Sequence, residues 1–283
     1  MVRPGDAENV SARDAELAQL HLHVSGLHRL ESLIHRAEFI ESVDARDRTK
    51  NIRTLLESDY DLIVTVGISM DEDTRLAADE WPGAAFIGVD QPAGESRPNL
   101  ASLTFPEDQG GFLAGALAAL TTNTGKVAAL CEVESLPSMW RYCEGFRVGV
   151  QYADPNMRAR VLYKDESETG ELFNDPKWGE EQSLFMLDGG VDILFAAGGE
   201  TARAALETAA ARGLYVIGAD EDMFHQLENA DFVLSSAVKQ AGTGVYALIR
   251  FFVDGQFRAG ETRGEYALGP YHRLERQVPP TVR

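Results

Sequence analysis

The chain of 283 residues is short of basic side chains and of long apolar segments, and each shortage excludes a class of protein. Lys and Arg number 26 against 45 Asp and Glu, which gives a formal net charge of −19. Nucleic-acid phosphates and anionic membrane surfaces both attract clustered basic side chains, so this excess of acid argues against either as a partner. No segment approaches the ~18–20 apolar residues of a membrane-spanning helix. We therefore expect no nucleic-acid partner and no direct membrane span.

Cysteine is also scarce, since the sequence contains only Cys131 and Cys143. Their number and spacing suggest neither a metal site nor a disulfide framework, so we expect two buried free thiols, one in a strand and one in a helix. No serine, histidine or cysteine arrangement with catalytic spacing occurs, and we expect no catalytic residue, metal or cofactor. The N-terminus shows neither an export signal nor a lipid-acceptor cysteine.

The sequence does contain helical and strand patterns in regular alternation. Apolar residues at three- and four-residue steps predict helices over residues 14–34, 46–58, 71–80, 107–122, 138–153, 177–188, 200–212 and 241–253. Short apolar runs predict strands over residues 37–42, 61–66, 84–89, 126–131, 158–163, 191–196, 214–219 and 232–238, with a further short strand from Tyr266. This alternation predicts an α/β protein with parallel sheets and crossover helices on both faces.

The alternating elements are too many for one sheet and predict two similar lobes. The first lobe is expected to contain residues 1–104 and 236–263, with residues 1–13 disordered, and the second residues 105–235 and 264–283. Repeated crossing between lobes creates a hinge, which is typical of clam-shell binding proteins.

Three residues follow predicted strands at the carboxyl ends, where ligands of open α/β sheets bind. Asp90 and Asp220 each end an apolar strand, and Gly198 stands where the backbone can approach a ligand closely. A carboxylate at the position of Asp220 can accept hydrogen bonds from two hydroxyls of a sugar. It can equally cap the turn that follows, and the sequence leaves the two roles open.

Two further residues complete the candidate site. Phe173 either packs in the core or lies on a loop as a stacking platform for a planar ring, and the turn-forming residues after it favour the platform. Lys239 follows the late strand near the predicted lobe crossing. It is either solvated or a contact for the ligand or for lobe closure.

A collinear set of segments within residues 37–280 resembles one known family. The segments are Lys50–Ile52, Tyr60–Gly67, Asn99–Ser102, Gly111–Gly115, Thr124–Val127, Leu136–Pro137, Glu144–Gly149, Phe173–Pro176, Phe195–Gly199, Val216–Asp220, Ser235–Lys239 and Leu268–His272. The chain resembles the basic membrane protein (BMP) family of substrate-binding proteins. This family includes the purine nucleoside receptor lipoproteins of bacterial ABC transporters.

The resemblance implies a type I periplasmic-binding-protein fold with two Rossmann-like lobes and a nucleoside captured between them. Phe173 would stack on the base, Asp220 would hold the ribose hydroxyls, Asp90 and Lys239 would line the cleft, and Gly198 would let the backbone approach the ligand. The implied partner is an ABC transporter permease. The implied location is extracytoplasmic, associated with the cell membrane.

The sequence departs from the family pattern at its start. Family members begin with an apolar strand and a D-x-S-F-N loop that forms part of the base-binding wall, whereas this sequence passes from a polar tail into the helix at Asp14. Either the sequence begins downstream of the true start or it is a divergent member. We expect weak or absent nucleoside binding by this chain alone, and micromolar or tighter binding would contradict that expectation.

Two alternatives remain, the first of them built on the same fold. A cytoplasmic ligand-sensing regulator would explain the missing export signal, but the N-terminal helix is too short and too acidic for a helix-turn-helix DNA reader. An enzyme acting on nucleosides would need a base, a metal cluster or a nucleophile in the cleft, and the sequence suggests none.

Overall fold

The computed structural model describes residues 36–42, 45–165 and 172–269, and it divides the chain into two compact units. Unit 1 comprises Met1–Thr104 and Gln240–Gly264, and unit 2 comprises Phe105–Lys239 and Glu265–Arg283. The chain thus passes from one unit to the other three times. The second passage follows Lys239 rather than residue 235, because the last strand before it extends in the sheet of unit 2 as far as Lys239.

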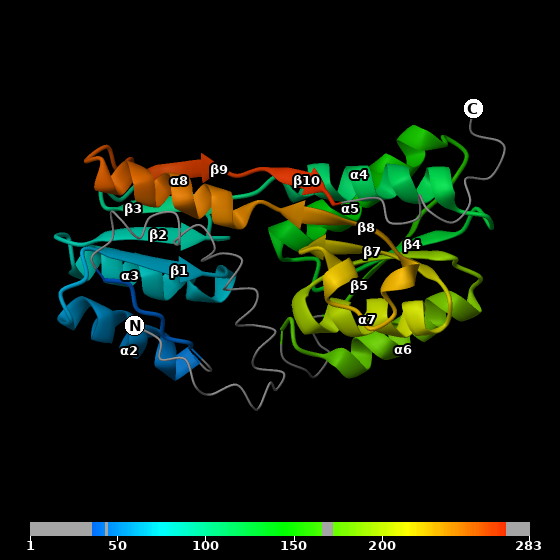
Figure 1. Cartoon of the computed structure of the whole chain (residues 1–283), viewed down its shortest axis with the longest axis horizontal. Helices are drawn as coiled ribbons and strands as arrows, with labels where there is room; N and C mark the ends of the chain where they lie inside the picture. Colours follow the sequence, from blue (N-terminus) through cyan, green and yellow to red (C-terminus); the bar gives the residue numbers. More distant parts are fainter. Residues whose placement is uncertain (1–35, 43–44, 166–171, 270–283) are drawn as a thin grey trace. The chain divides into compact units, whose positions relative to one another are not determined.

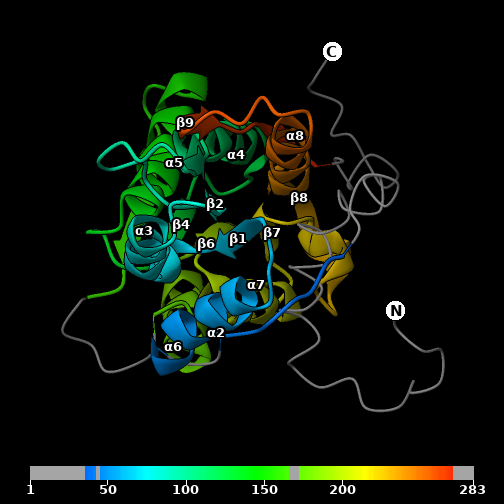
Figure 2. The same ribbon diagram turned by 90° about the vertical axis from the view of Figure 1, so that its left-hand side faces the viewer.

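Unit 1 contains a four-stranded parallel sheet in the order β1-β2-β3-β9. Its elements are α2 (Ala45–Glu57), β1 (Leu62–Val66), α3 (Asp71–Glu80), β2 (Ala85–Val89), β3 (Leu100–Thr104), α8 (Ala241–Val253) and β9 (Gly260–Arg263). Helices α3 and α8 lie on opposite sides of the sheet (Figures 1 and 2). Ile63 and Phe86 face α2 and α3, whereas Leu103 contacts Gly244 of α8.

Unit 2 contains a six-stranded sheet in the order β10-β8-β7-β6-β4-β5, in which only β10 is antiparallel. Its strands are β4 (Val127–Cys131), β5 (Arg160–Tyr163), β6 (Ile193–Ala197), β7 (Tyr215–Asp220), β8 (Val233–Lys239) and β10 (Tyr266–Leu268). Its helices are α4 (Glu107–Thr121), α5 (Pro137–Ala153), α6 (Pro176–Asp188) and α7 (Gly199–Ala211).

Alternate residues of the central strands of unit 2 supply two separate cores. Ala129 and Phe195 pack beneath α4 and α5, whereas Leu130 and Leu194 pack beneath α6 and α7. This division follows from the two-residue period of a strand, which turns successive side chains to opposite faces. Both faces are apolar, which explains the continuous apolar runs in the sequence.

Several expectations from the sequence were wrong or cannot be compared with the structure. Residues 37–42 form no strand, and the segment is instead held by side chains, with Tyr60 donating a hydrogen bond to Glu38 (2.8 Å). The sequence did not predict β3 as a separate strand. It also did not predict β9, which is polar because it lies at the edge of its sheet. The expected helix over residues 14–34 and the expected disorder of residues 1–13 lie outside the described residues.

The expectation of free thiols was also wrong, because Cys131 and Cys143 form a disulfide. Cys131 ends β4, and α5 packs over the same face of the sheet and brings Cys143 to it, with a Cα–Cα separation of 6.3 Å. Both residues are fully buried. Among the described residues, no helix is both long enough and apolar enough to cross a membrane.

Helices α4 and α5 approach each other closely through glycines. A Cβ added to Gly111 would lie 2.1 Å from the carbonyl oxygen of Tyr142, and one added to Gly115 would lie 2.0 Å from that of Phe146. Side chains at these positions would therefore separate the two helices. Of the three glycines of α4, only Gly110 faces the sheet, where it lies against Ala237 and Tyr266.

Replacing Gly115 by alanine tests this close helix packing. We expect Gly115→Ala to lower the free energy of unfolding by about 1–3 kcal/mol, because the new methyl group overlaps backbone that has little room to move. Chemical denaturation followed by circular dichroism measures the loss. Gly83→Ala is the control, since a Cβ there meets nothing within 4 Å. Equal stability of Gly115→Ala and the wild type would contradict the proposed packing.

Candidate functional site

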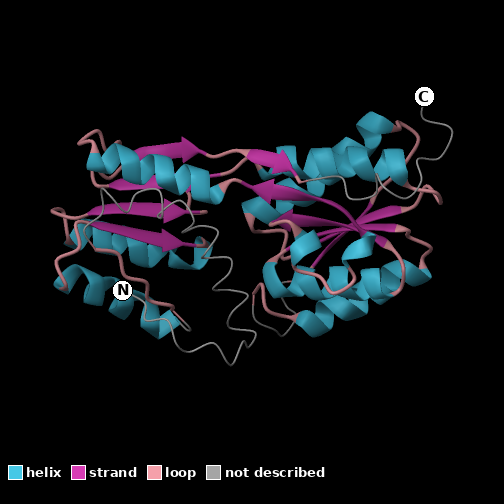
Figure 3. Ribbon diagram, in the orientation of Figure 1, coloured by secondary structure: helices cyan, strands magenta, loops and turns pink. Residues whose placement is uncertain are grey.

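The candidate site in unit 2 lies at the carboxyl ends of its parallel strands. β4, β6, β7 and β8 run in the same direction, so these ends lie along one edge of the sheet (Figure 3). Glu132 follows β4, Gly198 follows β6, and Asp220 and Lys239 end β7 and β8. The four strands thus place two acids, a lysine and a glycine at the carboxyl end of the sheet, where ligands of such sheets bind.

Asp220 is held by two side chains of unit 2. Its Oδ1 atom accepts a hydrogen bond from the Tyr142 hydroxyl (2.6 Å) and lies 3.0 Å from Nζ of Lys239. The Asp220 side chain stays 34% exposed, whereas that of Lys239 is only 9% exposed. Lys239 is therefore not a solvated surface residue, and the carboxylate of Asp220 remains accessible from one side.

Two tyrosines extend this network. The hydroxyls of Tyr142 and Tyr266 are hydrogen-bonded to each other, and the Tyr266 ring packs edge-on against Phe105 at 6.1 Å between ring centroids. Nζ of Lys239 lies 5.3 Å from the centre of the Phe105 ring, within the range of a cation–π interaction. Burial raises the pKa of the Tyr142 hydroxyl well above its usual value, so the hydroxyl remains a neutral donor to Asp220.

The backbone of Phe173 is fixed on both sides. Its N–H donates to Oε1 of Glu132 (3.0 Å), and its carbonyl accepts from the backbone N–H of Glu200 (2.9 Å). The ring is partly buried against the core beneath α4 and α5. Two residues later, Asp175 caps α6 by accepting from Trp178 N (3.1 Å). The core-packing alternative for Phe173 is thus realised in part, and part of the ring remains exposed.

Glu132 is a buried acid that the sequence analysis did not single out. Its side chain is fully buried, and Oε1 accepts from Thr201 Oγ1 (2.6 Å) as well as from Phe173 N. A Cβ added to Gly198 would lie 2.6 Å from Cγ of Glu132, so glycine leaves room for this carboxylate. Glu132 follows a buried apolar strand directly, and this position is the one signal in the sequence that could have identified it.

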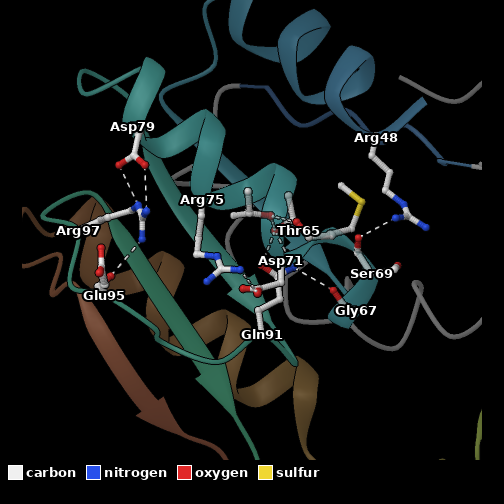
Figure 4. Close-up of polar contacts among 12 residues, drawn as sticks. Arg48, Thr65, Gly67, Ser69, Asp71, Arg75, Asp79, Gln91, Glu95 and Arg97 are labelled. Carbon is white, nitrogen blue, oxygen red and sulfur yellow. Dashed lines mark hydrogen bonds and ion pairs between the residues drawn. The ribbon is translucent and has the colours of Figure 1, made fainter. Parts of the chain in front are cut away.

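Unit 1 contributes a separate group at the carboxyl ends of its own strands (Figure 4). Asp90 follows β2, and its N–H donates to Leu103 O (2.9 Å). The next residue, Gln91, is 1% exposed and donates from Nε2 to Thr65 Oγ1 (3.0 Å) and Gly67 O (3.1 Å). Gln91 therefore ties the ends of β1 and β2 together beside Asp90.

Three of the sequence-predicted site residues adopt left-handed backbone conformations. The φ angles are 59° at Asp90, 64° at Phe173 and 67° at Asp220, and Asp59 is the only other non-glycine residue with positive φ in the described part of the chain. Gly198 has φ 134°. Such conformations cost roughly 1–3 kcal/mol each for a non-glycine residue and concentrate at ligand-binding sites. Three of the predicted residues thus share a property that the sequence did not show.

Glu221, beside Asp220, is a buried acid with an altered proton affinity. The residue is 8% exposed, and Oε1 of its side chain has no hydrogen-bond partner among the described residues. Burial, and secondarily the negative charge of Asp220, raise its pKa to about 7. The folded protein therefore binds this proton more tightly than the unfolded chain does.

This difference predicts a pH-dependent effect of Glu221→Gln. Between about pH 4.5 and 7 the unfolded chain loses this proton while the folded protein keeps it, so the stability of the wild type falls by about 3 kcal/mol over this range. Glutamine stays neutral, so we expect the free energy of unfolding of Glu221→Gln relative to the wild type to rise by about that amount between pH 4.5 and 8. Denaturant titrations at both pH values measure it, with the exposed Glu180→Gln as control. Parallel pH profiles for Glu221→Gln and the wild type would show that Glu221 is not buried as described.

Comparisons with known proteins agree with this architecture. The model of the family described as Bmp, ABC transporter substrate-binding protein PnrA-like, matches residues 23–264. The CD4+ T-cell-stimulating antigen of Listeria monocytogenes is 28% identical over 244 residues, which cover 81% of this chain and 66% of that protein. The ABC transporter nucleoside-binding protein BmpA of Lactococcus lactis is 25% identical, over 78% of this chain and 65% of that protein. The chain thus spans just under two thirds of the length of these relatives.

A solved structure extends the comparison to the fold. The ABC transporter system solute-binding protein of Aeropyrum pernix K1 superposes with a TM-score of 0.73 at 26% identity, over 88% of this chain and 71% of that one. These findings confirm the resemblance seen in the sequence and the expected type I periplasmic-binding-protein fold. The chain belongs to the Bmp family of PnrA-like ABC transporter substrate-binding proteins.

Proposed function

We propose that this substrate-binding protein captures a nucleoside, with a purine base preferred, and delivers it to the permease of an ABC transporter. The observation that carries the proposal is the pair Phe173 and Asp220. Each lies in a left-handed backbone conformation, at one edge of the same sheet, and each is held by a buried side chain. An aromatic ring and an acid are the two groups that a base and a ribose require.

Each proposed contact has a chemical reason. The partly exposed ring of Phe173 stacks on the base, and the exposed side of the Asp220 carboxylate accepts hydrogen bonds from the ribose hydroxyls. Lys239 forms an ion pair with the acid and adds a donor near the sugar. Gly198 allows the backbone to approach the ligand. Asp90, which follows β2 in unit 1, is a further candidate ligand contact.

The disulfide supports an extracytoplasmic location. Disulfides persist in oxidising compartments and are rare in the cytosol, so the Cys131–Cys143 bond favours a transport protein outside the cytoplasmic membrane over a cytoplasmic regulator with the same fold. Attachment to the membrane through a lipid is part of the proposal. The BmpA relative named above, described as a nucleoside-binding protein, supports the ligand class.

Saturation-transfer NMR with inosine, adenosine and guanosine tests the proposal, because it detects binding as weak as ~1 mM. The sequence left weak and absent binding both open. Because unit 2 holds both Phe173 and Asp220 in place, we expect weak but saturable binding, with a Kd above ~1 μM. Phe173→Ala is expected to weaken it at least ~10-fold, the usual loss for base stacking. Asp220→Asn is expected to weaken it by ~10-fold or more through lost charged hydrogen bonds.

Two exposed residues of α6 supply matched controls. Phe185→Ala and Asp188→Asn make the same chemical changes on the surface of unit 2, and we expect both to bind like the wild type. Absence of binding at millimolar nucleoside, or equal losses in the site and control variants, would refute the proposed function. Comparison of the three nucleosides with cytidine tests the preference for purines.

A further inference from the structure

The two cysteines of the disulfide each neighbour a residue that holds a proposed ligand contact. Cys131 directly precedes Glu132, whose Oε1 accepts the N–H of Phe173. Cys143 directly follows Tyr142, whose hydroxyl donates to Asp220. One covalent bond therefore joins the immediate chain neighbours of Glu132 and Tyr142, the two residues that position the aromatic ring and the acid.

We infer that the Cys131–Cys143 disulfide positions the ligand-binding groups of unit 2, holding Phe173 and Asp220 in a fixed mutual arrangement. The inference rests on the proposed function for the roles of Phe173 and Asp220. The cysteines contact neither the ligand nor the protein surface, since both are fully buried. They act through Glu132 and Tyr142, which are positioning residues.

The contacts that lead from Cys131 through Glu132 to Phe173 leave little room for movement. Glu132 is fully buried, and its carboxylate also accepts from Thr201 Oγ1 at the start of α7. Its Cγ fills the space that a side chain at Gly198 would occupy. The side chain of Glu132 therefore cannot swing aside, and a shift of the end of β4 moves the acceptor of the Phe173 N–H.

The path from Cys143 to Asp220 is similarly tight. The carbonyl oxygen of Tyr142 lies against Gly111 of α4. The centroid of the Tyr142 ring lies 5.9 Å from that of the Phe195 ring in β6. Tyr142 is fully buried, so its hydroxyl reaches Asp220 only from this position of the α5 backbone. Without the disulfide, the relative position of β4 and this turn of α5 would depend on side-chain packing alone.

A cross-link that merely stabilises the fold makes a different prediction from one that positions the site. If the disulfide only stabilises the fold, its removal weakens unit 2 as a whole. If it positions the site, its removal first disturbs two hydrogen bonds, that of the Phe173 N–H with Glu132 and that of Asp220 with Tyr142. Val150→Ala is a matched control, because Val150 is fully buried in the same core beneath α4 and α5 and its truncation destabilises the unit with the disulfide intact.

The first measurements need no ligand. Protein denatured without a reductant is expected to show no reactive thiol, and two thiols per chain would overturn the inference. Hydrogen exchange is then compared between the wild type, Cys131→Ala/Cys143→Ala and Val150→Ala. The measured quantity is the exchange rate of the Phe173 amide divided by that of the Ile217 amide in β7. We expect this ratio to rise at least ~10-fold in the double cysteine variant and to stay unchanged in Val150→Ala. Unchanged exchange at Phe173 would overturn the inference.

Nucleoside affinity supplies the second readout. We expect the double cysteine variant to bind ~10-fold more weakly than the wild type, and Tyr142→Phe to cause a much smaller further loss in that variant than in the wild type, because both changes act on Asp220. Unchanged affinity of the double cysteine variant, or equal effects of Tyr142→Phe in both backgrounds, would contradict positioning. If the wild type binds no nucleoside, the proposed function fails, and the exchange of Phe173 alone decides whether the disulfide positions this loop.

Discussion

One carboxylate oxygen, Oδ1 of Asp220, joins three elements of unit 2, and the proposed binding edge depends on it. Asp220 ends β7, Tyr142 reaches it from α5, and Lys239 reaches it from the end of β8. Hydrogen bonds to a charged group are about twice as strong as neutral ones, so this acid is held firmly although one side remains exposed. The backbone of Asp220 keeps its left-handed conformation because these contacts stabilise it.

The close packing of α4 on α5 makes this contact possible. Glycine at positions 111 and 115 lets the two helix backbones approach, and this approach sets the turn of α5 from which Tyr142 reaches the sheet edge. The same turn carries Cys143, which is bonded to the end of β4. Beyond that bond, Glu132 holds the loop of Phe173. Core packing and the candidate site are thus parts of one continuous set of contacts in unit 2.

The sequence predicted the regular elements well where apolar periodicity was strong. The expected helix over residues 71–80 is α3 as observed, and the expected helix over 107–122 ends one residue later than α4. Prediction failed at β9 and at residues 37–42, for opposite reasons. The edge strand β9 is polar, and residues 37–42 carry an apolar pattern but form no strand. Edge strands bury little surface, so selection for apolar residues is weak there.

The candidate site likewise contains residues that the sequence suggested and residues that it did not. Positions after predicted strands suggested Asp90, Gly198, Asp220 and Lys239 as candidate site residues, and the loop setting suggested Phe173. That these residues bind a ligand stays a prediction. The buried partners Glu132 and Tyr142 could not be predicted, because a glutamate after a strand and a tyrosine in an apolar helix have many common explanations. The disulfide was missed for a related reason, since pairing depends on which elements meet in space.

By itself the sequence determined the α/β class, the positions of most helices and strands, and the family, because these depend on local periodicity and on collinear motifs. Only the tertiary structure decided that Cys131 bonds to Cys143, that Lys239 pairs with Asp220, and that Glu132 supports Phe173. Each of these contacts joins residues between 12 and 41 positions apart in the chain. Such contacts arise from how helices pack on the sheet, and no local pattern in the sequence records that packing.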